Sequence, residues 1–600
     1  MRADRNHGFR FAPPVATRVG PSGAKAFRDQ GAVQQASKPL VNGYNDRKVA
    51  AMKKCDSPFR LRRPIAFAAS TLPHMNQRVA SALLGRRKMW GGSSSHTSAT
   101  GGRRYNAHVF AGRCARLCAL GLTVLLTTVA AAEPPEDSRT RCPKNVLLIL
   151  TDDQSAHLAC LGTPGIATPN IDRLAAGGIL FRNAFATCAS CSPSRSSILT
   201  GMYPHSNGHW RNTFTPTMAD PDKEYGREGS IRDHVGVHED LPTLIEILND
   251  RGYVTGITEK FHLSPPWKYP FHHRKAVTPH PASHKKAARE FFAACADKPF
   301  FLMANVGNTH RPFKPHTVPI DTPPADPNEI VVPPDLADTP AMRADLAEYF
   351  TTVQCADAVV GAIIEALRES GHDEDTLIIC TSDQGYAYHR AKATPYDAGI
   401  RVPLVFLGPG MRKDVTTREL FSHVDLTPTI LDYLGIAIPA SVQGRSIRPF
   451  LDGKSATTGN ELVFFEHNAH GPAPQSLYPS RSVTDGRMHY IRNLMPERRF
   501  HPPADMIETE FWGNHAFQAT LDAKEEFPIQ YDLLERTYHR PPEELYDLHT
   551  DPGELHNLIG DKRFAPTCDK LRKAVADWMK QTNDPGNPTK IIRRTEAMKK

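Results

Sequence analysis

Four apolar runs, each with the length and composition of a buried β-strand, alternate with helical patterns in this 600-residue chain. The runs span residues 145–150, 253–258, 300–306 and 376–381, and the helices are predicted at 168–178, from residue 240, and at 339–370. Such alternation is typical of an α/β fold built around a largely parallel sheet. The 468 residues from Glu133 onward are enough for two domains with full cores.

Polar side chains follow each of the four predicted strands at the point where the strand ends. Ligands of open α/β sheets gather at the carboxyl ends of the strands, so we expect these side chains to meet at one edge. Three carboxylates and one amide among them suit a hard cation such as Ca²⁺ or Mg²⁺, although an Asp pair after a strand is also common as a cap or turn. The residues are Asp152, Asp153, Lys260, His262, His310, Asp383 and Gln384.

The segment 191–201 combines a possible nucleophile with a fixed turn and a cation. A nearby cation activates the thiol of Cys191, Pro193 fixes one backbone angle, and Arg195 can donate two hydrogen bonds to an oxyanion. This pattern favours covalent catalysis on an anion. The same residues, taken alone, fit a buried structural cysteine beside a turn equally well.

The full pattern Cys-x-Pro-Ser-Arg-x-x-x-Leu-Thr-Gly, which begins at Cys191, resembles the signature of the type I sulfatases. In that family the Cys is converted to Cα-formylglycine by a formylglycine-generating enzyme, so the resemblance implies that residue 191 works as a hydrated aldehyde. It also implies an alkaline-phosphatase-like α/β sandwich with a large mixed, mostly parallel sheet over residues 143–440. A smaller C-terminal α+β domain with an antiparallel sheet is expected over residues 441–600.

The resemblance further implies a calcium ion that contacts residue 191 and is held by the carboxylates and amide after the first and fourth strands. Gln384 departs from the family, which most often has Asn or His there, but it offers the same carbonyl on a longer arm. The implied metal ligands are Asp152, Asp153, Cys191, Asp383 and Gln384.

The resemblance also implies a separate role in sulfate transfer for each catalytic residue. Arg195 and the metal hold the diol at residue 191, while three cations neutralise the sulfuryl oxygens: Lys260, His310 and Lys392. His310 or Lys392 protonates the leaving atom, and His262 takes the proton from the second hydroxyl so that sulfate is expelled.

Additional segments resemble the heparan N-sulfatase group within this family, and the likeness covers nearly all of residues 143–586. They are residues 341–353, 375–383, 478–483 and 578–585. If specificity carries over, the substrate is a terminal N-sulfated glucosamine and the bond cleaved is N–S. Three alternatives stay open: an O-sulfatase acting on another sulfated polysaccharide, a phosphate-ester hydrolase of the same superfamily, and a non-catalytic protein that binds sulfated glycans.

The basic charge of the chain belongs to its leader. Of 73 Lys and Arg and 64 Asp and Glu, residues 1–132 contain 22 and 4, so residues 133–600 contain 51 and 60 and have a net charge of −9. No nucleic-acid partner is therefore expected. We predict a basic low-complexity leader over residues 1–112 and a signal peptide over 113–132, in which Arg113 and Arg116 precede an apolar run.

That apolar run has 13 residues, fewer than the roughly 20 that span a bilayer, so no stable membrane span is expected. We predict export to a periplasmic, extracellular or lysosome-like compartment. Apart from Cys191, seven cysteines follow residue 132. An odd number does not favour a framework in which every cysteine forms a disulfide. The oligomeric state is open, with a homodimer as one candidate.

The predicted secondary structure of the C-terminal part differs from the alternation of strands and helices before it. Residues 462–465 and 488–492 are predicted to be antiparallel strands, residues 544–554 a turn that docks the small sheet, and residues 566–581 an amphipathic helix. The loop 467–478 is expected to overhang the pocket and to select the sugar through His467, His470 and Gln475.

Overall fold

The computed structural model describes residues 144–213, 235–471 and 474–590. By their contacts, residues Gly112–Lys600 form one compact unit, and all of the described residues belong to it. The predicted leader over residues 1–112 and the predicted signal peptide over residues 113–132 lie outside the described residues.

An eight-stranded sheet in the order β4-β3-β5-β1-β6-β7-β2-β8 forms the centre of the protein. Only β7 runs antiparallel to its neighbours, so the predicted mixed, mostly parallel sheet is confirmed. The four predicted strands are adjacent, in the order β3-β5-β1-β6. The strands are β1 Asn145–Thr151, β2 Ile179–Phe185, β3 Val254–Thr258, β4 His273–Lys275, β5 Phe300–Val306, β6 Thr376–Ser382, β7 Leu404–Leu407 and β8 Val415–Ser422.

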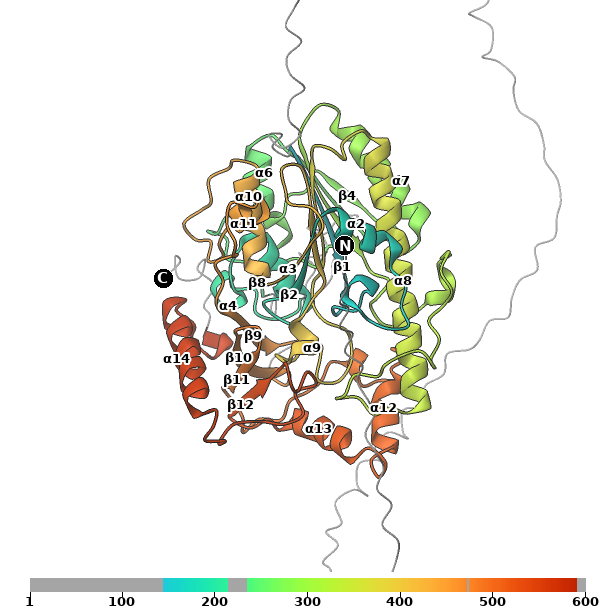
Figure 1. The fold of residues 1–600 in the computed structure, drawn as a ribbon. Coiled ribbons are helices and arrows are strands. Elements are labelled where there is room, and N and C mark those ends of the chain that lie inside the picture. Colours follow the sequence, from blue (N-terminus) through green and yellow to red (C-terminus); the bar gives the residue numbers. More distant parts are fainter. Residues whose placement is uncertain (1–143, 214–234, 472–473, 591–600) are drawn as a thin grey trace, which may run out of the picture. The chain divides into compact units, whose positions relative to one another are not determined.

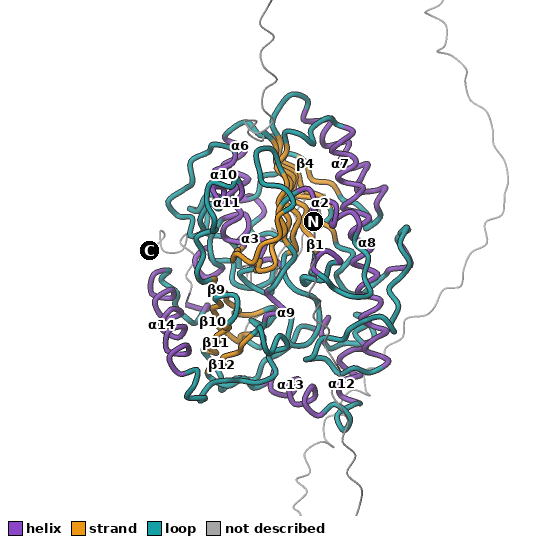
Figure 2. The backbone as a smooth tube through the Cα atoms, viewed as in Figure 1, coloured by secondary structure: helices purple, strands orange, loops and turns teal. Residues whose placement is uncertain are grey.

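Helices cover both faces of this sheet, as Figures 1 and 2 show. Alternate residues of a strand point to opposite faces, so Val146, Leu148 and Leu150 enter one core while Leu147 and Ile149 enter the other. The first core is completed by α3 Cys191–Thr200, α6 Leu244–Asp250, α10 Leu426–Tyr433 and α11 Arg448–Leu451, and the second by α2 Pro169–Gly177, α7 Pro281–Cys295 and α8 Pro340–Glu369.

Local capping decides where two of these helices begin. The helix predicted from residue 240 begins instead at Leu244, because the Thr243 hydroxyl accepts the N–H of Glu246 and the Glu246 carboxylate accepts the N–H of Thr243. Helix α8 begins after the cap Thr339, as predicted. Within the described ranges, α8 is the one helix long and apolar enough to cross a membrane, but 83% of that stretch is buried, so it packs as a core helix.

A second, antiparallel sheet has the order β12-β11-β10-β9, as expected for the C-terminal part. Helix α14, Ala565–Gln581, packs on it, which confirms the predicted helix. The edge strand β12 spans Glu543–Asp547, the first part of the segment predicted as a turn, and a turn follows it at residues 548–550. The other strands are β9 Val463–Ala469, β10 Leu477–Thr484 and β11 Met488–Asn493.

The two sheets meet at the loop that leads from β2 to α3. The N–H of Glu466 on β9 donates to the carbonyl of Thr187 (2.9 Å), and the rings of Phe185 and Phe465 lie 5.3 Å apart. Helix α11 packs in the core of the large sheet, and the domain boundary expected at residue 441 stays a prediction. The remaining helices are α4 Pro204–Asn207, α9 Asp397–Ile400, α12 His515–Asp522 and α13 Pro528–Tyr538.

Replacing Leu148 with Ala should lower the free energy of unfolding by about 3 kcal/mol, because a cavity opens in the core beneath β1. Denaturant titration measures this loss. Val331→Ala is the control: its side chain is 66% exposed, so a change within about 0.5 kcal/mol is expected. Equal effects of the two substitutions would contradict the assignment of Leu148 to the core.

Candidate active site

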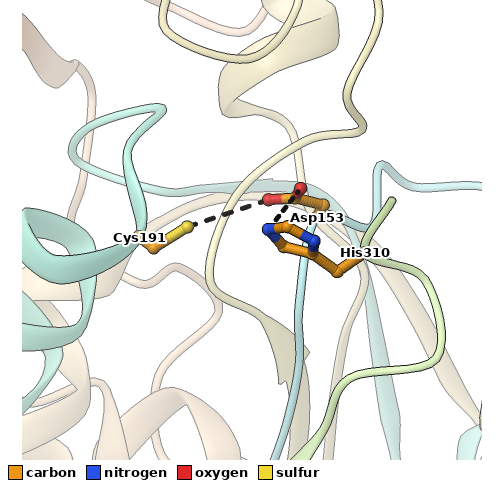
Figure 3. Close-up of side chains that lie close together, drawn as sticks. All are labelled: Asp153, Cys191 and His310. Carbon is orange, nitrogen blue, oxygen red and sulfur yellow. Dashed lines mark hydrogen bonds and ion pairs between the residues drawn. The ribbon is translucent and has the colours of Figure 1, made fainter. Parts of the chain in front are cut away.

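The residues that follow β1 and β6 meet the first residue of α3 at one edge of the sheet. The N–H of Asp153 donates to Oδ1 of Asp383 (3.1 Å). Nε2 of Gln384 donates to Oδ1 of Asp153 (2.7 Å) and lies 3.3 Å from Sγ of Cys191. Figure 3 shows that Cys191 and His310 approach one carboxylate: Sγ is 3.9 Å from Oδ1 of Asp153, and Nε2 is 3.6 Å from Oδ2.

Arg195 lies one helical turn after Cys191 and is fully buried. Its Nε donates to Oδ2 of Asp383 (2.9 Å), Nη1 donates to Oδ1 of Asn305 (2.6 Å), and Nη2 lies 3.4 Å from Oδ1 of Asp152. The guanidinium is therefore paired with the carboxylates around Cys191. The sequence predicts that Arg195 holds the diol at residue 191. In the structure Arg195 bonds to Asp152 and Asp383, and both carboxylates lie next to Cys191.

Two lysines neutralise the Asp pair after β1. Nζ of Lys260 lies 2.8 and 2.7 Å from the two carboxylate oxygens of Asp152. Nζ of Lys392 donates to Oδ2 of Asp153 (2.6 Å) and to Oδ2 of Asp505 (2.5 Å). Burial alone would lower the pKa of Lys392, but Asp153 and Asp505 hold it well above its usual value, so this side chain stays cationic.

Backbone carbonyls orient the two predicted histidines. Nδ1 of His310 donates to the carbonyl of Arg311 (2.5 Å), which turns Nε2 toward Asp153. Nε2 of His262 donates to the carbonyl of Thr213 (2.9 Å), and its Nδ1 is buried with no hydrogen-bond partner among the described residues. Burial lowers the pKa of His262 well below its usual value, so the ring is neutral and carries a free lone pair on Nδ1.

Three non-glycine residues at the ends of β1 and β3 have backbone angles in the left-handed region: Asp153 (φ 60°), Glu259 (φ 63°) and His262 (φ 30°). Residues with a Cβ seldom adopt this conformation, which is found disproportionately at active sites. At Glu259 the carboxylate accepts the N–H of Gly307 (2.8 Å). That bond ties the end of β3 to the loop that carries His310.

The donor set fits a hard divalent cation. Asp152, Cys191 and Asp383 each offer a ligand atom, and these atoms lie within 4.8 Å of one another. Oε1 of Gln384 is buried and finds no hydrogen-bond partner in the part of the chain that the structure describes. Carboxylate and amide oxygens are ligands that Ca²⁺ prefers. The residues present therefore fit the implied metal.

Net charge supports the same conclusion. The site holds three cations against four carboxylates, so one divalent cation would leave it at +1, which suits an anionic substrate. The cations are Arg195, Lys260 and Lys392, and the carboxylates are Asp152, Asp153, Asp383 and Asp505. Burial raises the pKa of the Cys191 thiol to about 12, so an unmodified thiol is neutral and a weak nucleophile.

Asp505 and Asn305 belong to the site but were not predicted from the sequence. Asp505 belongs to the short 3-10 turn Ala504–Met506, in a segment without strand or helix periodicity, and no local signal indicates it. Asn305 is a polar residue in the apolar run of β5, which is a usable signal. Its Nδ2 donates to the carbonyls of Thr258 and Lys260 (2.9 Å each), so it fixes the end of β3 against β5.

The expectation for the loop 467–478 is corrected in part. His467 lies on β9 and is fully buried, with its ring 6.3 Å from that of Phe500, so it does not overhang the pocket. A cavity of about 340 Å³ is lined by His470 and Gln475 together with His501. Selection of the sugar by this loop stays a prediction.

A closed ring of hydrogen bonds joins His470 to the start of α3. Nδ2 of Asn212 donates to Nε2 of His470, Nδ1 of His470 donates to the hydroxyl of Ser190, and that hydroxyl donates to Oδ1 of Asn212, each at 3.0 Å. Oδ1 of Asn212 also accepts the N–H of Ser192 (2.9 Å). Burial lowers the pKa of His470 to about 4, so the ring is neutral, as this pattern requires. The ring holds the residues on both sides of Cys191.

Comparison with known proteins identifies the family. A sulfatase family model matches residues 144–436, and a model described as N-sulphoglucosamine sulphohydrolase, C-terminal, matches residues 386–500. Human N-sulphoglucosamine sulphohydrolase is 33% identical over 485 residues, which cover 74% of this chain and 91% of that protein. The chain belongs to the sulfatase family.

Solved structures share the fold of this sulfatase. A protein in complex with its substrate D-glucosamine-2-N,6-O-disulfate has a TM-score of 0.54 and 20% identity, covering 75% of this chain and all of that one (100%). The phosphonate monoester hydrolase of Silicibacter pomeroyi has a TM-score of 0.51 and 21% identity, covering 74% and 96%. The sulfatase is thus a hydrolase with a fold shared by enzymes of different chemistry, so its substrate depends on the site.

Replacing His470 with Ala should lower kcat about 10- to 100-fold and change KM little, because the turn on both sides of residue 191 loses its alignment. Steady-state kinetics on a sulfated substrate measures this effect. His501→Ala is the matched control, since His501 lines the same cavity. His470→Gln, which keeps a donor and an acceptor, should restore part of kcat. Equal kcat values for wild type and His470→Ala would contradict the positioning role.

Proposed function

We propose that this sulfatase removes the N-sulfate group from a terminal glucosamine of heparan-type glycans. The observation that carries the proposal is the 33% identity to human N-sulphoglucosamine sulphohydrolase, which extends over 91% of that protein. The match of residues 386–500 to the C-terminal model of the same enzyme supports it, because this segment includes Lys392 and the strands next to the site.

Residue 191 is proposed to act as formylglycine. A hydrated aldehyde supplies one hydroxyl that attacks sulfur and a second hydroxyl whose deprotonation expels sulfate. Neutral His262 is suited to take that proton, because its Nδ1 has no hydrogen-bond partner among the described residues. Ser190 and Ser192 hold residue 191 through Asn212, so the nucleophile is fixed before substrate binds.

The cations around residue 191 are proposed to bind the sulfate group. The ammonium groups of Lys260 and Lys392 and Nε2 of His310 all lie against the Asp152–Asp153 pair that borders Cys191. They can neutralise the sulfuryl oxygens in a site that excludes water, where such interactions are strong. As the N–S bond breaks, His310 or Lys392 gives a proton to the leaving nitrogen, which departs as an amine.

A calcium ion is proposed between residue 191 and the carboxylates. Asp152, Asp153, Asp383 and Gln384 would hold it, and it would stabilise negative charge on the attacking hydroxyl. Arg195 keeps Asp383 and Asp152 in place for this task, because both carboxylates pair with its buried guanidinium.

Mass spectrometry of the protein purified from its own host tests the modification. We expect the peptide that contains Cys191 to be lighter by about 18 Da, the change from thiol to aldehyde that creates the reactive group. The same experiment reads the mature N-terminus, which is expected after residue 132. An unmodified thiol would contradict the mechanism and would favour a protein that binds sulfated glycans without turnover.

An assay on two sulfated sugars tests the specificity. We expect kcat/KM for N-sulfated glucosamine to exceed that for 6-O-sulfated glucosamine at least about tenfold, since recognition of polar groups gives discrimination of this size or larger. Cys191→Ala is the inactive control. A higher kcat/KM for the O-sulfated sugar would contradict the proposal and would indicate an O-sulfatase.

Removal of calcium should lower both activity and thermal stability. A ligand at 100 times its Kd stabilises the folded state by about 2.7 kcal/mol, so Tm should rise when Ca²⁺ is added to protein treated with a chelator. Gln384→Ala should reduce this Tm shift, and Gln384→Asn should keep most of it, because Asn retains the carbonyl oxygen. A Tm that does not depend on Ca²⁺ in the wild-type protein would contradict the metal site.

A further inference from the structure

The candidate active site opens to solvent at His310. The side chain of His310 is 25% exposed, whereas Lys260 is 16% exposed and Lys392 is 1% exposed. A substrate whose sulfate lies against residue 191 therefore extends past His310. Side chains beside His310 are therefore placed to contact the part of the substrate that lies beyond the sulfated ring.

An aromatic pair lies beside His310. The ring of Trp512 is 5.9 Å from that of His310, and the ring of Phe511 packs edge-to-face on Trp512 at 5.0 Å. Phe511 is 69% exposed. Apolar and aromatic side chains line most sites that bind small molecules, so an exposed aromatic pair beside the candidate active site is placed to contact a substrate. Aromatic rings offer a flat apolar face at little cost in side-chain entropy.

Hydrogen bonds hold the turn that carries this pair. Nη1 of Arg311 donates to the carbonyl of Gly513 (3.1 Å), and Arg311 is itself fixed by an ion pair with Asp345 (2.5 Å). The neighbours of His310 and of Trp512 in the chain are thus bonded to each other. Gly513 has φ 63°, and its N–H donates to the carbonyl of Thr509 (3.0 Å).

A second bond anchors the turn to the catalytic cluster. Nδ2 of Asn514 donates to the carbonyl of Asp505 (3.0 Å), and the side chain of Asp505 accepts a hydrogen bond from Lys392. The aromatic pair is therefore fixed relative to the catalytic cations before any ligand arrives. Such preorganisation lowers the entropy that binding costs.

We propose that Phe511 and Trp512 form a subsite for the sugar ring adjoining the sulfated glucosamine, and that they bind that ring through its apolar face. This inference rests on the proposed function, because it places the sulfated ring at residue 191. Glu508 and Glu510 belong to the same turn. Their negative charge disfavours a second sulfate on the adjoining ring, and carboxylates can accept hydrogen bonds from sugar hydroxyls.

Kinetics on two substrate lengths tests the subsite. The substrates are N-sulfated glucosamine alone and a tetrasaccharide with the same ring at its non-reducing end. Phe511→Ala should lower kcat/KM for the tetrasaccharide about tenfold, the effect of losing about 1.4 kcal/mol of aromatic contact, and should leave the monosaccharide within about twofold. Phe511→Tyr should behave as wild type. Equal losses on both substrates, or no loss on the tetrasaccharide, would overturn the proposal.

Binding of a tetrasaccharide without sulfate separates this proposal from the proposed function. Calorimetry should give a Kd about tenfold weaker for Phe511→Ala than for wild type. Ile529→Ala is the matched control, because Ile529 is an apolar residue on α13 that is 51% exposed, and its Kd should equal that of wild type. If no sulfated glucosamine is turned over, the proposed function fails, and this measurement still decides the subsite. Equal Kd values for Phe511→Ala and wild type, or no binding to wild type, would overturn it.

Discussion

The buried ion pair between Arg195 and Asp383 is the interaction on which the rest of the site depends. Both side chains are fully buried, and the guanidinium also reaches Asn305 and Asp152. One cation thus joins the helix that begins at Cys191 to the ends of β5, β1 and β6. Loss of either partner would leave an uncompensated buried charge, which typically costs about 3–5 kcal/mol.

Around that pair, opposite charges alternate, so that each carboxylate has a cationic partner. Burial by itself would raise the pKa of Asp152, but Lys260 and Arg195 hold it well below its usual value. An ionised carboxylate can bind a divalent cation, and the paired lysines remain available to an anionic substrate. Because each buried charge is paired with another, displacement of one side chain would leave its partner buried without an opposite charge.

The C-terminal sheet and the segment after it are part of this arrangement. Strand β9 supports the loop before α3, His470 fixes the residues around Cys191, and Asp505 holds Lys392. The turn that carries Trp512 lies against His310. Side chains at the end of the large sheet are therefore held in place by residues that follow it in the chain, and such supporting contacts fix the geometry of a site.

The strands β1, β3, β5 and β6 and the polar residues that follow them can be predicted from the sequence, because an apolar run and its last residues are local patterns. The sequence did not reveal β2, whose Arg182 and Asn183 interrupt the apolar run, or β7, which has only four residues. Tertiary contacts set the pairing of Asp505 with Lys392, 113 residues away, and the position of Trp512 beside His310. Contacts between distant irregular segments leave no periodic pattern in a single sequence, since they depend on how the two sheets pack.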